Sequence, residues 1–153
     1  MKNYILIAAA LFMASFSFSQ STEEINLIQS IFGVEKQEVV ADFVQPSDTE
    51  KDAFWKLYDE YETERKELGK QRIALLEEYA AEYMTMTSEQ ADAWTKKAIE
   101  LQKNTDALIV TYYGKIKKAT DGILATQFYQ IENYILTYIR MHILQEVPFV
   151  EKS

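Results

Sequence analysis

Apolar residues recur every three or four positions between Ala91 and Ala119, and this stripe constrains the fold more than any other feature of the sequence. Its members are Ala91, Trp94, Ala98, Leu101, Leu108, Tyr112, Ile116 and Ala119, with Thr105 in the same series. Such spacing places all of these side chains on one face of an α-helix. A helix with a single apolar face needs a partner to cover it, so the stripe predicts a long helix packed against another element.

A second long helix is predicted over residues 47–84, directly before the stripe. Ser47 and Glu50 have the spacing of a capping box at its start. Thr87 and Gln90 have the same spacing and are expected to cap the helix that carries the stripe. Because the connection between the two helices is short and their lengths match, we expect them to form an antiparallel hairpin.

Shorter helical segments are predicted on both sides of the hairpin. A short helix is expected over residues 21–33, and a second short apolar segment, residues 39–44, stops before Pro46. A last helix starts after the break at residues 119–122 and ends before Pro148. The chain has only four glycines and two prolines, and no Asn-Gly or Asp-Gly turn joins alternating apolar runs. The sequence therefore predicts an all-α fold: a long antiparallel helical hairpin with short N-terminal helices and a C-terminal helix.

Residues 1–19 have the pattern of a secretory signal peptide. A basic start at Lys2 is followed by an apolar run and by small residues before a predicted cleavage site between Ser19 and Gln20. An N-terminal membrane anchor is the alternative, but the apolar run is shorter than the ~20 residues of a spanning helix. We expect an exported protein, periplasmic in a Gram-negative-type envelope or secreted, with residues 20–153 forming one helical domain that does not insert into the membrane.

Composition argues against nucleic-acid binding and against the common catalytic chemistries. The 24 acidic and 16 basic residues give a net charge of −8, which is repelled by phosphate backbones. The chain has no cysteine, and its single histidine is His142, so thiolate and multi-histidine metal sites are not expected. No phosphate-binding loop, dinucleotide fingerprint or nucleophile elbow is present. We predict a non-enzyme without catalytic residues, metal or cofactor, and keep a metal or haem carrier using His142 as the weakest hypothesis.

Aromatic residues at helical spacing mark the start of the first long helix. Trp55, Tyr58 and Tyr61 could form a ligand platform, but core packing or a dimer interface is the favoured interpretation. A thin hairpin leaves apolar surface that a second copy of the chain or a partner would cover. A homodimer is therefore expected.

The layout resembles that of the Spy/CpxP family, small periplasmic stress proteins named for an L-T-x-x-Q motif. The resemblance covers roughly residues 40–140. The segments that look like the family's two motif helices are VQPSDTEKDAFWKLYDEYETERKELGKQR and KKATDGILATQFYQIENYI. The literal motif match, from Thr87 to Gln90, lies at the hairpin turn.

The resemblance implies a helical hairpin in a curved antiparallel dimer whose concave face holds unfolded proteins without ATP. The expected client-binding residues are Arg65, Leu68 and Arg72, in the polar middle of the first long helix. The alternative function is an envelope sensor or adaptor module that binds one specific protein partner through its acidic N-terminal arm or its apolar tail.

Overall fold

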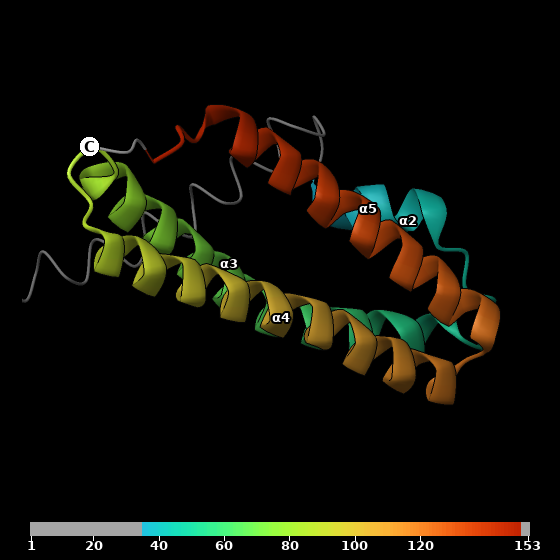
Figure 1. Cartoon of the computed structure of the whole chain (residues 1–153). Coiled ribbons are helices and arrows are strands. Elements are labelled where there is room, and N and C mark those ends of the chain that lie inside the picture. Colours follow the sequence, from blue (N-terminus) through green and yellow to red (C-terminus); the bar gives the residue numbers. More distant parts are fainter. Residues whose placement is uncertain (1–34, 151–153) are drawn as a thin grey trace, which may run out of the picture.

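The computed structural model describes residues 35–150 (Figure 1). This part of the chain contains four α-helices and no strand: α2 (Lys36–Phe43), α3 (Lys51–Glu82), α4 (Ser88–Ala119) and α5 (Gly122–Glu146). The prediction of an all-α fold is confirmed for these residues. The predicted signal peptide and the predicted short helix at residues 21–33 lie outside the described residues.

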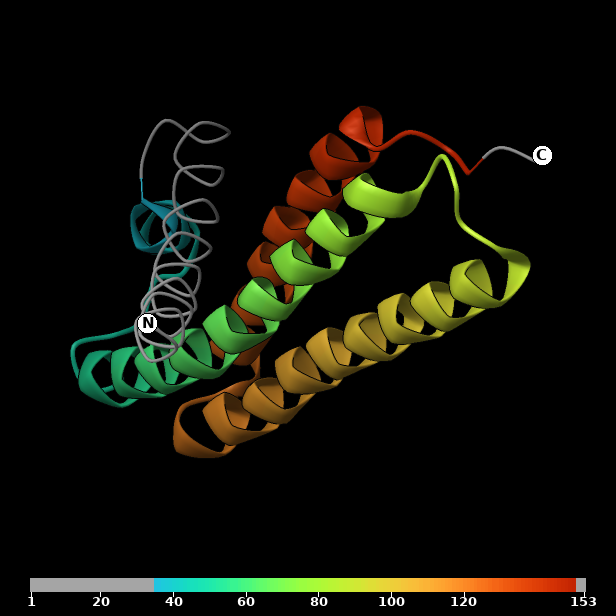
Figure 2. The same ribbon diagram turned by 90° about the vertical axis from the view of Figure 1, so that its left-hand side faces the viewer.

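Helices α3 and α4 lie antiparallel and form the two arms of a hairpin (Figure 2). Each arm has 32 residues, which corresponds to about 48 Å of α-helix. Two hydrogen bonds made by side chains of α4 fix their register. Near the turn the Trp94 indole N–H donates to the carbonyl of Leu75 at 2.8 Å, and further along the Tyr112 hydroxyl donates to the Glu64 carboxylate at 2.6 Å.

Of the four described helices, α4 and α5 start with a side-chain cap, whereas α2 and α3 do not. The Thr87 hydroxyl accepts the backbone N–H of Gln90 at 3.2 Å, while the Gln90 side chain accepts that of Thr87 at 2.8 Å, which is a complete capping box. At Ser47 the box is only half formed. The Ser47 N–H donates to the Glu50 carboxylate, but the N–H of Glu50 is already engaged by the Ser47 carbonyl at 3.0 Å. Helix α3 consequently starts at Lys51, without a side-chain cap.

Helix α5 returns alongside the start of α3 and completes the core. Asp121 caps its first turn by accepting the N–H of Leu124 at 2.8 Å. The rings of Tyr61 and Phe128 meet edge to face with their centroids 5.1 Å apart. The buried core contains Val40, Val44, Phe54, Tyr58, Tyr61, Ile109, Tyr112, Ile116, Leu124, Ala125, Phe128, Ile131, Ile135 and Ile139.

This core gathers at one end of the hairpin, which we call the packed end. All its α3 residues come from the first third of that helix, and all its α4 residues come from the second half. Towards the hairpin turn, which we call the turn end, α5 diverges from the hairpin (Figure 1). There the Tyr79 hydroxyl donates to the carbonyl of Pro148 at 2.6 Å and ties the tail after α5 back to α3. None of the helices between residues 35 and 150 is long and apolar enough to cross a membrane.

Two isoleucines on α5 allow a test of where the core lies. Ile135 is fully buried, whereas Ile123 is 73% exposed. We expect Ile135→Ala to lower the free energy of unfolding by ~2–5 kcal/mol, because it removes apolar contacts and leaves a cavity. The same change at Ile123 should cost less than ~0.5 kcal/mol. Urea unfolding followed by circular dichroism measures both, and equal losses would contradict this placement of the core.

Candidate functional site

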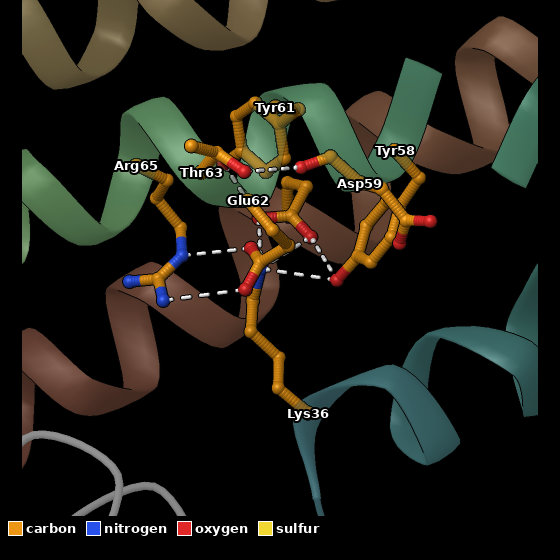
Figure 3. Close-up of polar contacts among 8 residues, drawn as sticks. Lys36, Tyr58, Asp59, Tyr61, Glu62, Thr63 and Arg65 are labelled. Atoms are coloured by element: carbon orange, nitrogen blue, oxygen red, sulfur yellow. Dashed lines mark hydrogen bonds and ion pairs between the residues drawn. The ribbon is translucent and has the colours of Figure 1, made fainter. Parts of the chain in front are cut away.

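Four charged side chains from three helices meet at the border of the packed end, and we call them the charge cluster (Figure 3). They are Lys36 of α2, Glu62 and Arg65 of α3, and Glu132 of α5. The Lys36 ammonium lies 2.7 and 2.8 Å from the two carboxylate oxygens of Glu132, which is fully buried. Lys36 also pairs with Glu62, so one ammonium joins α2 to both α3 and α5.

Two tyrosine hydroxyls complete the set of hydrogen bonds around Glu132. The Tyr61 hydroxyl donates to this carboxylate at 2.6 Å, and the Tyr58 hydroxyl donates to its other oxygen at 3.3 Å. Burial, and then the negative charge of Glu132, raise the pKa of both tyrosines well above the usual value, so both remain protonated donors. No buried side-chain polar atom in the described part of the chain lacks a partner.

Glu62 is held in its ionised form by the two cations beside it. Burial alone would raise its pKa, but the charges of Lys36 and Arg65 outweigh that effect and lower the pKa to about 2. The Arg65 guanidinium reaches both carboxylate oxygens, at 2.7 and 3.3 Å. Since each oxygen of Glu62 and Glu132 accepts a bond from within the protein, the charge cluster acts as a clamp that holds α2 on α3 and α5.

Beyond the charge cluster, towards the turn end, an apolar cleft of about 490 Å³ lies between α3, α4 and α5. We call it the arginine cleft. Its lining consists of Arg72, Leu75 and Leu76 from α3, Trp94, Thr95, Ala98, Ile99, Leu101, Gln102 and Lys103 from α4, and Arg140, Ile143 and Leu144 from α5. A smaller cavity of about 50 Å³ lies between the charge cluster and the arginine cleft. It is lined by Arg65 of the cluster and by Arg72 of the cleft.

The structure brings the three predicted client-binding residues together along one side of α3, but in different settings. All three line the small cavity. Arg65 is only 4% exposed and paired with Glu62, so it belongs to the charge cluster and not to the surface. Leu68 is half-buried, and Arg72 also lines the arginine cleft.

The structure also shows where the predicted aromatic platform and His142 lie. Tyr58 and Tyr61 are core residues, and their rings pack against Phe128. His142 lies on the ring of Tyr138, and its Nδ1 is 3.0 Å from the Tyr138 carbonyl. Among residues 35–150, no group of three or more His, Cys, Asp and Glu side chains is placed to hold a metal ion.

Sequence reasoning missed the charge cluster and the contribution of α5 to the cleft. A signal for the first exists: Glu132 lies four residues after Phe128 and three before Ile135, inside the apolar series of the last helix. A carboxylate in such a position needs a buried cation. Nothing in the local pattern identifies Lys36, which lies 96 positions away in the sequence. Arg140 likewise stands in no motif.

Comparison of this chain with protein-family models, with curated protein sequences and with solved structures gives no match. Membership of the Spy/CpxP family is therefore not shown.

The Lys36–Glu132 pair allows a test of the clamp. Lys36→Met should lower the free energy of unfolding by ~3–5 kcal/mol, because it leaves a buried carboxylate without its cation. Adding Glu132→Leu should recover at least half of that loss. Lys70→Met, which breaks the more exposed pair with Glu67, is the matched control and should cost less than ~1 kcal/mol. Urea unfolding measures all three, and a control loss as large as that of Lys36→Met would contradict the clamp.

The lowered pKa of Glu62 predicts how the free energy of unfolding depends on pH. Because the pKa of Glu62 is about 2 in the folded protein and about 4.3 in an unfolded chain, its stabilising effect is complete above about pH 5 and is lost as the pH falls towards 2. The stability difference between the native protein and Glu62→Gln should therefore be largest near neutral pH. It should shrink by up to ~3 kcal/mol in acid. Urea unfolding at a series of pH values measures this difference, and a pH-independent difference would contradict it.

Proposed function

We propose that the protein is an exported, ATP-independent chaperone that holds unfolded proteins in the bacterial envelope. The observation that carries this proposal is the arginine cleft, an apolar cleft of about 490 Å³ that the described residues leave open. On its walls Ile99 and Leu144 are 49% and 64% exposed. Contiguous exposed apolar surface of this kind is typical of interaction sites. The resemblance to the Spy/CpxP family supports the same function.

The physical properties of the cleft suit weak and reversible binding. Its apolar walls offer contacts to the side chains that an unfolded client exposes, with no need for a defined client sequence. The cleft is open, so a client residue buried there keeps part of its solvent contact and can leave in order to fold. The net charge of −8 helps to keep a loaded chaperone soluble.

Export and dimer formation are part of the same proposal. The pattern of residues 1–19 supports export. A homodimer, as the family resemblance implies, would place two clefts in one particle and cover part of the exposed apolar surface.

The proposal predicts that the purified protein suppresses aggregation of a chemically unfolded client at near-stoichiometric ratios without ATP, as measured by light scattering. The double variant Leu68→Ala/Arg72→Ala should lose at least half of this protection, because Arg72 lines the arginine cleft and both residues line the small cavity beside it. Arg65 is left unchanged because it belongs to the charge cluster.

The matched control is Val110→Ala/Lys96→Ala, which also removes one apolar and one basic side chain. Val110 is 58% exposed, and Lys96 forms an exposed pair with Asp92 on α4, so neither lines the cleft. Circular dichroism checks that both double variants remain helical. Equal protection by the two variants would remove the cleft from the proposal, and no suppression by the native protein would refute the chaperone function.

A second candidate is the sensor or adaptor module that binds one envelope protein. The observation that favours it is a groove of about 400 Å³ beside α2 and α5, lined by Phe43, Gln127, Gln130, Ile131 and Tyr134. Phe43 and Tyr134 are 59% and 56% exposed there. A module of this kind would not protect unrelated clients, so the aggregation assay separates the two functions.

A further inference from the structure

The basic residues of this acidic chain are unevenly distributed. The sequence contains three arginines, Arg65, Arg72 and Arg140, and all three line the small cavity at the head of the arginine cleft. The cleft itself is lined by Arg72, Arg140 and Lys103, and none of the described residues in its lining is Asp or Glu. All the charged side chains that line the cleft are thus basic, in a chain whose net charge is −8.

Two of these arginines, Arg72 and Arg140, line the cleft from different helices. Arg72 of α3 lies 3.5 Å from the side-chain oxygen of Gln102, which in turn donates to Asp106 at 2.7 Å. Arg140 of α5 lies 4.0 Å from the same Asp106 carboxylate. Arg72 and Arg140 are therefore linked through Gln102 and Asp106 of α4, and both line the small cavity and the cleft.

The contact between Arg140 and Asp106 is replaceable. The two side chains are 38% and 58% exposed, and a pair at 4.0 Å between exposed groups is weak. A guanidinium presents several N–H donors in a plane that matches a carboxylate. A carboxylate in the cleft could thus bind Arg72 and Arg140 together. Its bond to Arg140 would replace the weak contact of Arg140 with Asp106.

The remainder of the cleft is suited to an alkyl chain. Its walls consist mainly of Leu75, Leu76, Trp94, Ala98, Ile99, Leu101, Ile143 and Leu144. Its volume of about 490 Å³ lies within the ~300–1,000 Å³ range of small-molecule sites. An apolar cleft whose lining includes two arginines and no carboxylate is complementary to a molecule with an apolar body and an anionic head.

We propose that the arginine cleft binds a long-chain carboxylate, with its alkyl chain on the apolar walls and its carboxylate on Arg72 and Arg140. This site does not depend on the proposed chaperone function, although the two share Arg72. Other occupants of the cleft would be residues 20–34 of this chain, a second copy, or a client segment, and they become the alternatives if the test below shows no uptake.

Trp94 provides a local readout because it lines the cleft, while the chain's other tryptophan, Trp55, packs against the core. In the full chain carrying Trp55→Phe, 12-bromododecanoate below its micelle concentration should quench the fluorescence of Trp94 in a saturable manner. Arg72→Gln/Arg140→Gln should raise the half-saturating concentration at least tenfold. Lys56→Gln/Lys96→Gln removes two exposed charges outside the cleft and should change it less than twofold.

A second variant covers the case in which the arginine pair is needed for folding. Leu144 is 64% exposed, so Leu144→Asp should leave the fold intact while placing a negative charge on the cleft wall. It should also raise the half-saturating concentration at least tenfold, whereas Val110→Asp on an exposed position of α4 should not.

Three results would overturn the proposal. Equal quenching by a bromododecyl trimethylammonium cation would indicate general apolar adsorption with no role for the arginines. Unchanged affinity in both the arginine and the Leu144 variants would place the ligand elsewhere. Absence of quenching in the full chain would show that the cleft does not take up the carboxylate. None of these results depends on client protection, so the chaperone proposal is tested separately.

Discussion

The buried ion pair between Lys36 and Glu132 is the interaction on which the arrangement of the helices depends. Glu132 is fully buried, and a carboxylate in that position is tolerated only because an ammonium and two tyrosine hydroxyls surround it. The same ammonium contacts Glu62, so three helices are placed by one side chain. Replacing such a pair by apolar residues often stabilises a protein, which suggests that its value here is specificity of docking. The eight-residue helix α2 also buries Val40 in the core, and the ion pair adds a polar contact with fixed partners to that apolar one.

The cluster also separates two regions with different physical character. On one side lies the packed end, where aromatic and branched side chains interdigitate at low exposure. On the other side α5 diverges from the hairpin, and the arginine cleft replaces a continuous core. Charges at this boundary explain the polar middle of α3. Glu62 and Arg65 would be unfavourable in a wholly apolar interface, whereas here they pair with one another and with Lys36. The composition of α3 thus follows from its position between a core and an opening.

Much of this fold could be predicted from the sequence, since its strongest signals are local. The three-four spacing from Ala91 onwards, the Thr87–Gln90 box and the break before Gly122 all act over one or two helical turns, and the long helices start or end near the predicted positions. The site was less predictable because it depends on contacts between distant parts of the chain. The polar middle of α3 suggested an exposed surface. The local sequence does not distinguish Arg65, which is buried, from Arg72, which lines the cleft. Only the return of α5 decides between them.

The bond between Tyr79 and the carbonyl of Pro148 gives α5 an unusual mechanical situation. Its first turns are fixed in the core, and the segment after its last turn is attached to α3, so α5 is held near both of its ends. The width of the cleft between α5 and the hairpin can then change through curvature of α5 while both ends stay in place. Gentle curvature of a long helix is common, because it distributes small changes over many hydrogen bonds. The chain can therefore accommodate occupants of different thickness without detaching a helix or exposing the core.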